Sequence, residues 1–259
     1  MEAYNPLYSL AGLLVGMLVG LTGVGGGSLM TPLLVLAFGF HPATAVGTDL
    51  LYASATKTVG SAVHGVRGTV DWAIVRRLAT GSLPAALLTL LVLSRAGTAA
   101  KDTGATIAAV LGVALVLTAL ATFFRARIVA RIAPSFRGMS EARLAALTIA
   151  LGAILGVLVS LTSVGAGALG MTALLILYPL APINRLVGSD IAHAVPLTLI
   201  AGLGHWWLGS VDMMLLASLL AGSIPGIVLG SVIASRVTDR VLTPILATTL
   251  AVVGLKLVL

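Results

Sequence analysis

Cysteine is absent from the 259-residue sequence, charged residues make up only 9% of it, and aromatic residues only 5%. Without cysteine, the chain can form neither a disulfide nor a thiolate metal site. Soluble domains usually carry about 25% charged residues. A chain that is 59% hydrophobic has more apolar side chain than a soluble core of this size can enclose, so much of it must face lipid.

Apolar runs of about 20 residues make up most of the chain, and a helix of that length crosses the hydrocarbon core of a bilayer. These runs, with 30 glycines that let helices approach closely, predict an all-α polytopic membrane protein. The net charge of +7 does not indicate a nucleic-acid partner, because the arginines lie mainly between the apolar runs. The longest basic loop, residues 125–143, contains Phe136 as its only aromatic residue, so no base-stacking platform is expected.

The sequence contains an internal duplication. Leu21–Leu29 matches Leu161–Leu169 at an offset of 140 residues, and after a single-residue slip the matches continue at an offset of 141. Because the matches include Asp, His and Pro, shared apolar composition does not explain them. The later matches pair Val46-Gly-Thr-Asp49 with Val187-Gly-Ser-Asp190, His64 with His205, Gly68–Asp71 with Gly209–Asp212, and Gly81–Pro84 with Gly222–Pro225.

We therefore expect a first transmembrane repeat at residues 1–124, an Arg-rich cytoplasmic linker at 125–143 and a second transmembrane repeat at 144–259. Each repeat begins with an apolar run that a glycine cluster interrupts, and three spans follow. The interrupted runs, each a broken helix or a hairpin, are Leu7–Phe38 and Leu144–Leu180. The spans are predicted at Ala43–His64, Trp72–Leu93, Thr103–Phe124, Gly188–Leu208, Val211–Ala234 and Val241–Leu259.

The orientation of the halves depends on whether the interrupted run crosses the membrane once, which gives parallel halves, or folds back, which gives inverted repeats. We place the 125–143 loop in the cytoplasm and leave aside Lys57, which lies within a span. The inverted arrangement then has 11 basic residues inside and 3 outside, against 9 and 5 for the parallel one. The positive-inside rule favours inverted repeats, with both termini outside the cytoplasm.

The glycine clusters are the first candidate site. Four glycines in the five positions from Gly23 weaken a helix, and broken backbone at membrane depth is tolerated only where protein or a water-filled cavity satisfies it. A helix that restarts there presents free N–H groups and its positive dipole end to an anion. Helix packing by small residues is the alternative explanation. The candidate binding residues are Gly25, Gly26, Gly27 and Ser28, with Gly165 and Gly167 in the second copy.

A polar stripe follows each interrupted run and forms the second candidate site. Ionisable groups inside a span are costly and usually face a cavity or one another. Lys57, at mid-span, is interpreted as a cation facing the anion, or as a structural partner of Asp49 or another acid. The stripes recur at steps of three and four, which places each on one helix face; they are Asp49, Ala53, Thr56, Lys57, Gly60 and His64, and Asp190, Ala194, Thr198, Ala201 and His205.

Several acids and histidines have two interpretations. Asp49 and Asp190 either carry a coupling proton or cap a helix start, and His64 and His205 are either ligands or interfacial histidines. Asp71 and Asp212 are expected to begin the next helices. The sequence has no metal-ligand spacing, no order of catalytic Ser, His and Asp, and no HExxH motif, so we expect no metal, no cofactor and no enzyme.

At Gly23–Ser28, Pro32, Ala45-Val-Gly-Thr48, His64 and Gly68-Thr-Val-Asp71 the sequence resembles the sulfite exporter (TauE/SafE) family, also called the toluenesulfonate uptake permease family. The resemblance covers essentially the whole chain. It implies a secondary transporter of sulfite, organosulfonates or related sulfur oxyanions in a bacterial or archaeal inner membrane. Where the family pattern has a small polar residue after Val-Gly-Thr, this chain has Asp49, and Asp190 follows in the second copy.

These observations predict a secondary active transporter of a small sulfur oxyanion, with alternating access around a midplane site between the repeats. Backbone N–H groups of the glycine clusters would hold the anion, with Thr48, Ser189 and Lys57 assisting. Asp49 or Asp190, together with a histidine, would carry a coupling proton. An anion channel and a cation or metal transporter that uses Asp49 and Asp190 are the alternatives. The sequence leaves open the direction of transport, the coupling ion and whether the chain forms a homodimer.

Overall fold

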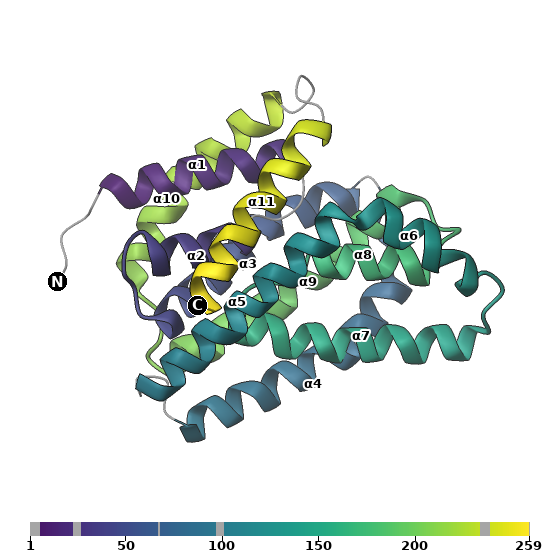
Figure 1. The fold of residues 1–259 in the computed structure, drawn as a ribbon, viewed down its shortest axis with the longest axis horizontal. Coiled ribbons are helices and arrows are strands. Elements are labelled where there is room, and N and C mark those ends of the chain that lie inside the picture. The colour runs from purple at the N-terminus through teal and green to yellow at the C-terminus, as the bar shows by residue number, and fades with distance from the viewer. Residues whose placement is uncertain (1–5, 23–26, 67, 97–100, 234–238, 259) are drawn as a thin grey trace.

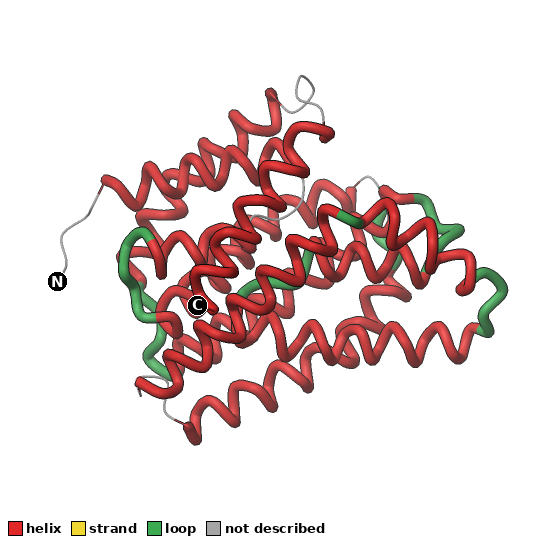
Figure 2. Tube along the Cα trace, in the orientation of Figure 1, coloured by secondary structure: helices red, strands yellow, loops and turns green. Residues whose placement is uncertain are grey.

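The computed structural model describes residues 6–22, 27–66, 68–96, 101–233 and 239–258, which form helices and no strand (Figures 1 and 2). The first half contains α1 (Pro6–Thr22), α2 (Gly27–Leu36), α3 (Pro42–Val66), α4 (Trp72–Ala96) and α5 (Lys101–Phe123). The short helix α6 (Arg125–Ile132) and a 3-10 turn, η1 (Ala133–Phe136), lead into the second half. The second half contains α7 (Glu141–Thr162), α8 (Ala168–Leu177), α9 (Ile183–Trp207), α10 (Met213–Ile233) and α11 (Asp239–Val258).

Five of the described helices are long and apolar enough to cross a membrane. They lie within α4, α5, α7, α9 and α10. The predicted spans therefore form helices near the expected residues. The 25-residue α3 is not one of the five, because Asp49, Lys57 and several hydroxyl side chains lower its mean hydropathy. Such a helix is stable at membrane depth only when other helices surround it.

The helices pair across the two halves. α1 lies along α10 and α4 lies along α7, while α3 packs on α9 and α5 on α11 (Figure 1). In the repeat, α7 is the equivalent of α1, and α10 is the equivalent of α4. The two outer pairs, α1 with α10 and α4 with α7, are therefore the same contact formed twice, once on each side of the central α3 and α9.

Small residues allow the outer pairs to approach backbone to backbone. Gly12 of α1 lies against the carbonyl oxygen of Leu219, and Gly226 of α10 lies against that of Leu13. In the other pair, Gly152 of α7 lies against the carbonyl oxygen of Leu78 in the same way. A side chain at any of these glycines would meet main-chain atoms. Packing of this kind drives association where lipid removes the hydrophobic force between helices.

The interrupted run of the second half is a helical hairpin. Its turn contains Ser163, with a φ of 58°, and Gly165 and Gly167, with φ values of 123° and 121°. Glycine adopts such left-handed backbone without a steric penalty. After the turn, α8 returns along α7, so that Gly170 lies against Leu155.

Contacts at corresponding places close the open ends of both hairpins. In the second half the Tyr178 hydroxyl lies 2.8 Å from Thr148 Oγ1, which joins the end of α8 to the first turns of α7. In the first half Tyr8, the equivalent of Thr148, packs edge-on against Phe38 at the end of α2, with ring centroids 5.1 Å apart. The beginning of α1 and the end of α2 are therefore neighbours, as are the beginning of α7 and the end of α8.

The central helices α3 and α9 run antiparallel. Gly47, near the start of α3, lies against His205, near the end of α9, and Leu51 lies against Gly202. Continued along α3, this register brings Lys57 level with Pro196, two residues from Thr198, which is the equivalent of Lys57 in the repeat. Lys57 and its equivalent, Thr198, therefore lie almost level with each other along the α3–α9 pair, close to the axis that relates the two halves. The core around this crossing is made by Val46, Leu50, Ala86, Val159, Ala194, Leu197 and Ala201.

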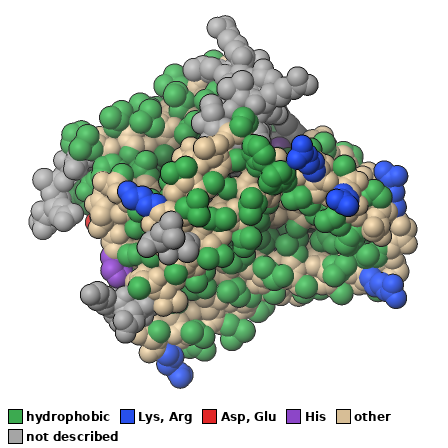
Figure 3. Space-filling view, viewed as in Figure 1, with side chains coloured by type: hydrophobic (Ala, Val, Ile, Leu, Met, Phe, Trp, Pro, Cys, Tyr) green, Lys and Arg blue, Asp and Glu red, His purple; other side chains and the backbone are tan. Residues whose placement is uncertain are grey.

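The outer surface is apolar over most of its length. Leu88, Val92 and Ile154 are among the large hydrophobic side chains that are more than half exposed. On the face seen in Figure 3, several Lys and Arg side chains gather at the end where α6 and the start of α7 lie in Figure 1. Hydrophobic side chains cover the broad region between that end and the opposite one. This distribution suits a protein whose middle faces lipid and whose end faces water.

Candidate functional site

Asp49 of α3 is fully buried, and its carboxylate contacts the first half of the short helix α2. Its Oδ2 atom accepts hydrogen bonds from the Thr31 backbone N–H at 3.2 Å and from Thr31 Oγ1 at 2.5 Å. Its Oδ1 atom has no hydrogen-bond partner among the described residues, and the hydroxyl of Ser163, from the α7–α8 turn, lies close to this carboxylate. The Asp49 carboxylate therefore lies between α2 of its own half and the α7–α8 turn of the other half.

Asp190 holds the equivalent position in the second half, over the third residue of α8. A Cβ atom at Gly170 would lie 2.7 Å from Asp190 Oδ1, so only glycine leaves room for the carboxylate there. Thr172, the equivalent of Thr31, does not bond to Asp190. It donates to the Ala168 carbonyl and accepts from Arg125 Nε at 3.3 Å. Arg125 also attracts Asp190 electrostatically, so the surroundings of the two carboxylates differ.

Neither carboxylate caps its own helix. α3 begins at Pro42 and α9 at Ile183, directly after Pro182, so Asp49 and Asp190 are the eighth residues of their helices. The helix-start interpretation of these two acids is therefore wrong. Proline favours the first turn of a helix, so both helices begin several residues before the Val-Gly-Thr/Ser sequence.

Lys57 lies between the two acids. Its side chain is 8% exposed, and both Asp190 and Asp49 attract it electrostatically. It forms no ion pair closer than 4 Å with either carboxylate; the ion pair that the described residues do form joins Arg77 to Glu141. A buried ammonium group is therefore held by two carboxylates at longer range, an arrangement that leaves its hydrogen-bond donors available.

The α7–α8 turn offers backbone donors. The Gly170 N–H donates to the Gly165 carbonyl at 3.0 Å, and the Met171 N–H donates to that of Gly167 at 2.9 Å. The buried N–H groups of Gly165, Ala166 and Gly167 find no acceptor within the described chain. α8 has ten residues and is about 15 Å long, so the turn lies about half a membrane thickness from the end of α8. Buried donors of this kind call for an anion or water.

The turn of the first half is only partly visible. Gly25 and Gly26 lie outside the described residues, and α2 begins at Gly27. Ser28 is the second residue of α2, and its side chain is not among those described. Of the two glycine turns, the one at Gly165 and Gly167 is therefore the one whose surroundings the structure describes.

Thr48 and Ser189 join the two halves. Thr48 Oγ1 accepts from the backbone N–H of Asp212 at 3.1 Å, and Ser189 Oγ accepts from that of Asp71 at 2.8 Å. Ser189 also donates to the Arg185 carbonyl at 2.7 Å. Both hydroxyls are fully buried, and each one anchors the loop that precedes a helix of the opposite half.

Asp71 and Asp212 cap the helices that follow them, as expected. The Asp71 carboxylate accepts from the backbone N–H groups of Ala73 and Ile74, at 3.0 and 3.4 Å. The Asp212 carboxylate accepts from two N–H groups of α10, both at 2.9 Å. These bonds satisfy donors that a helix start otherwise leaves free.

His64 and His205 lie at opposite ends of the α3–α9 pair, because these helices run antiparallel. His64 is half-buried, with Nδ1 2.8 Å from Thr69 Oγ1 in the loop after α3. His205 is fully buried, with Nε2 2.9 Å from the Ser160 carbonyl in the last turn of α7. Of the two, only His205 lies beside the glycine turn.

Sequence reasoning missed two buried polar side chains at equivalent positions, Tyr52 and His193. His193 is fully buried, with Nε2 2.8 Å from Ser82 Oγ of α4. Tyr52 is 1% exposed and lies beside Ser223 of α10, the equivalent of Ser82. The repeat itself carries the signal, since an offset of 141 aligns both pairs. His193 also follows Asp190 by three residues and therefore shares its side of α9.

Buried polar atoms without partners gather around the second-half hairpin. Within the described chain, Ser160 Oγ, Ser163 Oγ, Asp190 Oδ1, His193 Nδ1 and His205 Nδ1 are buried and unpaired. Such groups are uncommon in native structures and mark places where water or an ion binds. No three His, Cys, Asp or Glu side chains among the described residues are grouped to hold a metal ion. The polar region formed by α3, α7, α8 and α9 is the candidate site.

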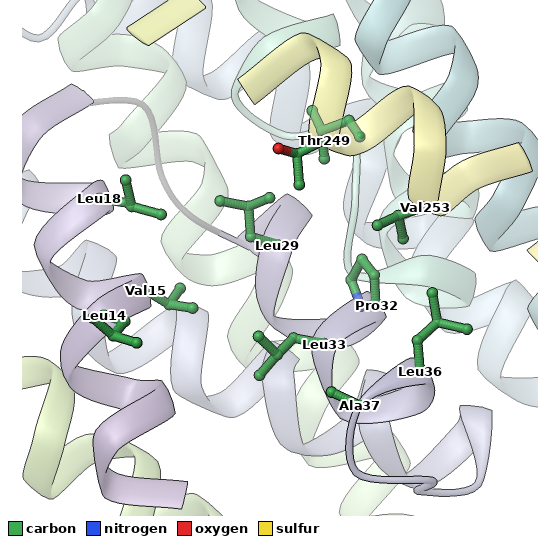
Figure 4. A pocket seen from close by; sticks show the side chains of 11 residues that line it. Leu14, Val15, Leu18, Leu29, Pro32, Leu33, Leu36, Ala37, Thr249 and Val253 are labelled. Atoms are coloured by element: carbon green, nitrogen blue, oxygen red, sulfur yellow. The ribbon is translucent and has the colours of Figure 1, made fainter. Parts of the chain in front are cut away.

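An opening elsewhere in the molecule has the wrong chemistry for an anion. The cleft of about 430 Å³ between α1, α2 and α11 is drawn in Figure 4. Thr249 is the one side chain of its lining with a polar group, and the others are apolar. An apolar cleft cannot repay the desolvation of a sulfur oxyanion.

Comparison with known proteins agrees with the sequence resemblance. The model of the family described as "Sulfite exporter TauE/SafE" matches residues 8–257. The probable membrane transporter protein YjnA of Bacillus subtilis (strain 168) is 42% identical over 212 residues, which cover 82% of this chain and 83% of that protein. The probable membrane transporter protein YunE of the same organism is 41% identical over 68 residues, about a quarter of each chain. No solved structure matches the chain significantly. The chain therefore belongs to the sulfite exporter TauE/SafE family of membrane transporters.

Proposed function

We propose that this transporter moves a small sulfur oxyanion, sulfite or a short organosulfonate, by proton-coupled alternating access in the inner or plasma membrane. The family description names sulfite, and the relatives are described as membrane transporters rather than enzymes. The observation that carries the proposal is the buried Lys57, held between Asp49 and Asp190 where α3 crosses α9. An ammonium group with unused donors at membrane depth suits an oxyanion that has lost part of its water.

The two halves would be inverted repeats, with residues 1–124 and 144–259 as the repeating units and 125–143 as the cytoplasmic linker. The antiparallel run of the equivalent helices α3 and α9 supports this arrangement, because parallel repeats would not reverse equivalent helices. The two folded-back hairpins support it as well. The substrate would then lie between the halves near the midplane, as in other inverted-repeat transporters.

Charge balance supports proton coupling. With both acids ionised, Lys57 and the two carboxylates carry one net negative charge. Even with Arg125 near Asp190, an added anion leaves this buried cluster negative, which is unfavourable. A proton on Asp49 or Asp190 removes that charge, so the anion and the proton would bind together. His205 could assist, because its Nε2 faces a carbonyl and its Nδ1 is then the basic nitrogen.

The anion would be held by Lys57 and by the backbone N–H groups of Gly165 and Gly167. Gly25, Gly26, Gly27 and Ser28 would have the same role in the first half. Thr48 and Ser189 would assist by fixing the loops that border the site, and His64 would take part in proton transfer at the end of α3. Each of these assignments predicts a measurable change in affinity or in coupling.

Flux into proteoliposomes tests the function. We expect uptake of sulfite or a C2 sulfonate that increases with an imposed proton gradient and saturates with substrate, and no uptake of a divalent metal. Anion flux that neither saturates nor responds to the proton gradient would indicate a channel. Uptake of a divalent metal without anion uptake would indicate a cation transporter that uses Asp49 and Asp190.

A further inference from the structure

His193 is a buried side chain that the proposed function has not used. It lies on α9 between Asp190 and Thr198, fully excluded from solvent, and Lys57 of the opposite half is near enough to act on it electrostatically. Its Nε2 faces Ser82 Oγ of α4, and its Nδ1 has no partner among the described residues. A buried imidazole usually satisfies both nitrogens, so the unpaired one requires an explanation.

The Ser82 hydroxyl determines which nitrogen carries the proton. Serines and threonines in these helices commonly donate to a carbonyl of their own helix, as Thr89 does to Ala85 at 2.8 Å. Ser82 has no such bond in the described chain, and its Oγ lies 2.8 Å from His193 Nε2, an acceptor for its hydrogen. A serine that donates to Nε2 leaves the proton of the neutral imidazole on Nδ1. With Ser82 as the donor, the His193 Nδ1–H is itself a hydrogen-bond donor.

His205 has the opposite tautomer. Its Nε2 lies 2.9 Å from a carbonyl oxygen, which only accepts, so this nitrogen carries the proton and Nδ1 is left as an acceptor. Helix α9 thus presents one imidazole as a hydrogen-bond donor and another as a base. Sequence alone does not distinguish them, because the difference comes from Ser82 and Ser160 on other helices.

We propose that His193 is a substrate-contacting residue that donates its Nδ1–H to an oxygen of the transported anion, and that Ser82 holds it in this tautomer. The inference rests on the proposed function and adds a neutral donor to the charged Lys57. The equivalent Tyr52 has a buried hydroxyl without a hydrogen-bond partner in the described chain, so the first half offers a neutral donor at the same position. The two donors differ in shape, which makes the site asymmetric and suits selection among oxyanions.

Replacement of His193 by two amides separates the two ring nitrogens. The asparagine amide nitrogen is two bonds from Cβ, as Nδ1 is, whereas the glutamine amide nitrogen takes the position of Nε2. Binding of sulfite and a C2 sulfonate is measured by calorimetry on the purified, full-length chain. We expect His193→Asn to bind within about threefold of the unmodified protein, and His193→Gln and His193→Leu to bind at least about tenfold more weakly, the usual cost of one such contact. His41→Asn, in the exposed α2–α3 connection, is the matched control.

The outcomes distinguish this inference from the proposed function. If the unmodified protein binds neither anion, the proposed function is wrong, and the role of His193 falls with it. If it binds them and all three His193 variants bind equally well, or if glutamine rescues binding and asparagine does not, the inference alone is wrong. Ser82→Ala decides the matter if the His193 variants fail to fold. A folded Ser82→Ala protein should bind severalfold more weakly, and unchanged affinity would reject the inference.

Discussion

Ser189 Oγ accepts a hydrogen bond from the backbone N–H of Asp71 at 2.8 Å, and this bond crosses from one half of the protein to the other. At the equivalent place, Thr48 Oγ1 accepts from the N–H of Asp212 at 3.1 Å. Two equivalent residues thus bind two equivalent loops, each in the opposite half. The Val-Gly-Thr/Ser sequence that marks the repeat is therefore also a contact between the repeats.

Ser189→Ala should destabilise the protein by about 1–2 kcal/mol, because the buried N–H of Asp71 loses its acceptor. Thr48→Ala should have a similar effect through Asp212. The measurement is the thermal unfolding midpoint of the purified variants. Ser94→Ala is the control, since Ser94 lies near the end of α4 and donates only to its own helix. Equal midpoints for Ser189→Ala and Ser94→Ala would show that the bond between the halves contributes nothing.

Both chain termini should lie outside the cytoplasm, with the 125–143 loop inside. The inverted arrangement requires this, and the 11-to-3 distribution of basic residues agrees with it. Reporter fusions at each terminus and within the loop measure the location. If both termini prove cytoplasmic, the inverted arrangement is rejected.

Lys57→Met should weaken anion binding by about 1–2 kcal/mol, because a charge-assisted contact is lost. Lys57→Arg should bind better than Lys57→Met but remain impaired, since the planar guanidinium has a different reach. Calorimetric titration with sulfite and a C2 sulfonate gives the affinities.

The double variant Lys57→Met with Asp49→Asn tests the structural alternative. If Lys57 serves only to neutralise Asp49, the double variant should recover stability and keep near-normal affinity. Unchanged affinity in a folded Lys57→Met protein would remove Lys57 from the site and leave the glycine turns as the anion-binding element.

Gly170→Ala should reduce transport at least about tenfold while the protein still inserts and folds. The added Cβ would meet Asp190 Oδ1 at 2.7 Å, so the carboxylate must move away from the start of α8. Uptake in proteoliposomes and the unfolding midpoint are measured together. The matched control is Gly65→Ala in α3, where a Cβ meets no atom within 4 Å. Equal transport by the two variants would mean that the position of Asp190 does not matter.

Much of this protein could be predicted from local sequence. The membrane-spanning helices, the duplication, the breaks at the glycine clusters and the caps Asp71 and Asp212 depend on the spacing and type of neighbouring residues. The start of α9 was predicted less well, because this helix begins at Ile183, directly after Pro182, and the expected span began at Gly188. The helix α3 begins at Pro42, next to the expected Ala43, so the Val-Gly-Thr sequence is not its start. Asp49 and Asp190 consequently lie within their helices.

The composition and the repeat of the sequence determined the class, the two-fold organisation and the candidate polar stripe, because hydropathy and periodicity are properties of adjacent residues. Only the tertiary structure decided that α8 folds back along α7, that α3 and α9 run antiparallel and that Lys57 lies between Asp49 and Asp190. It also placed His193 beside Ser82 of α4. These features depend on contacts between separate helices, such as Gly170 against Leu155 and Gly47 against His205, and no local pattern specifies which of several apolar faces will meet.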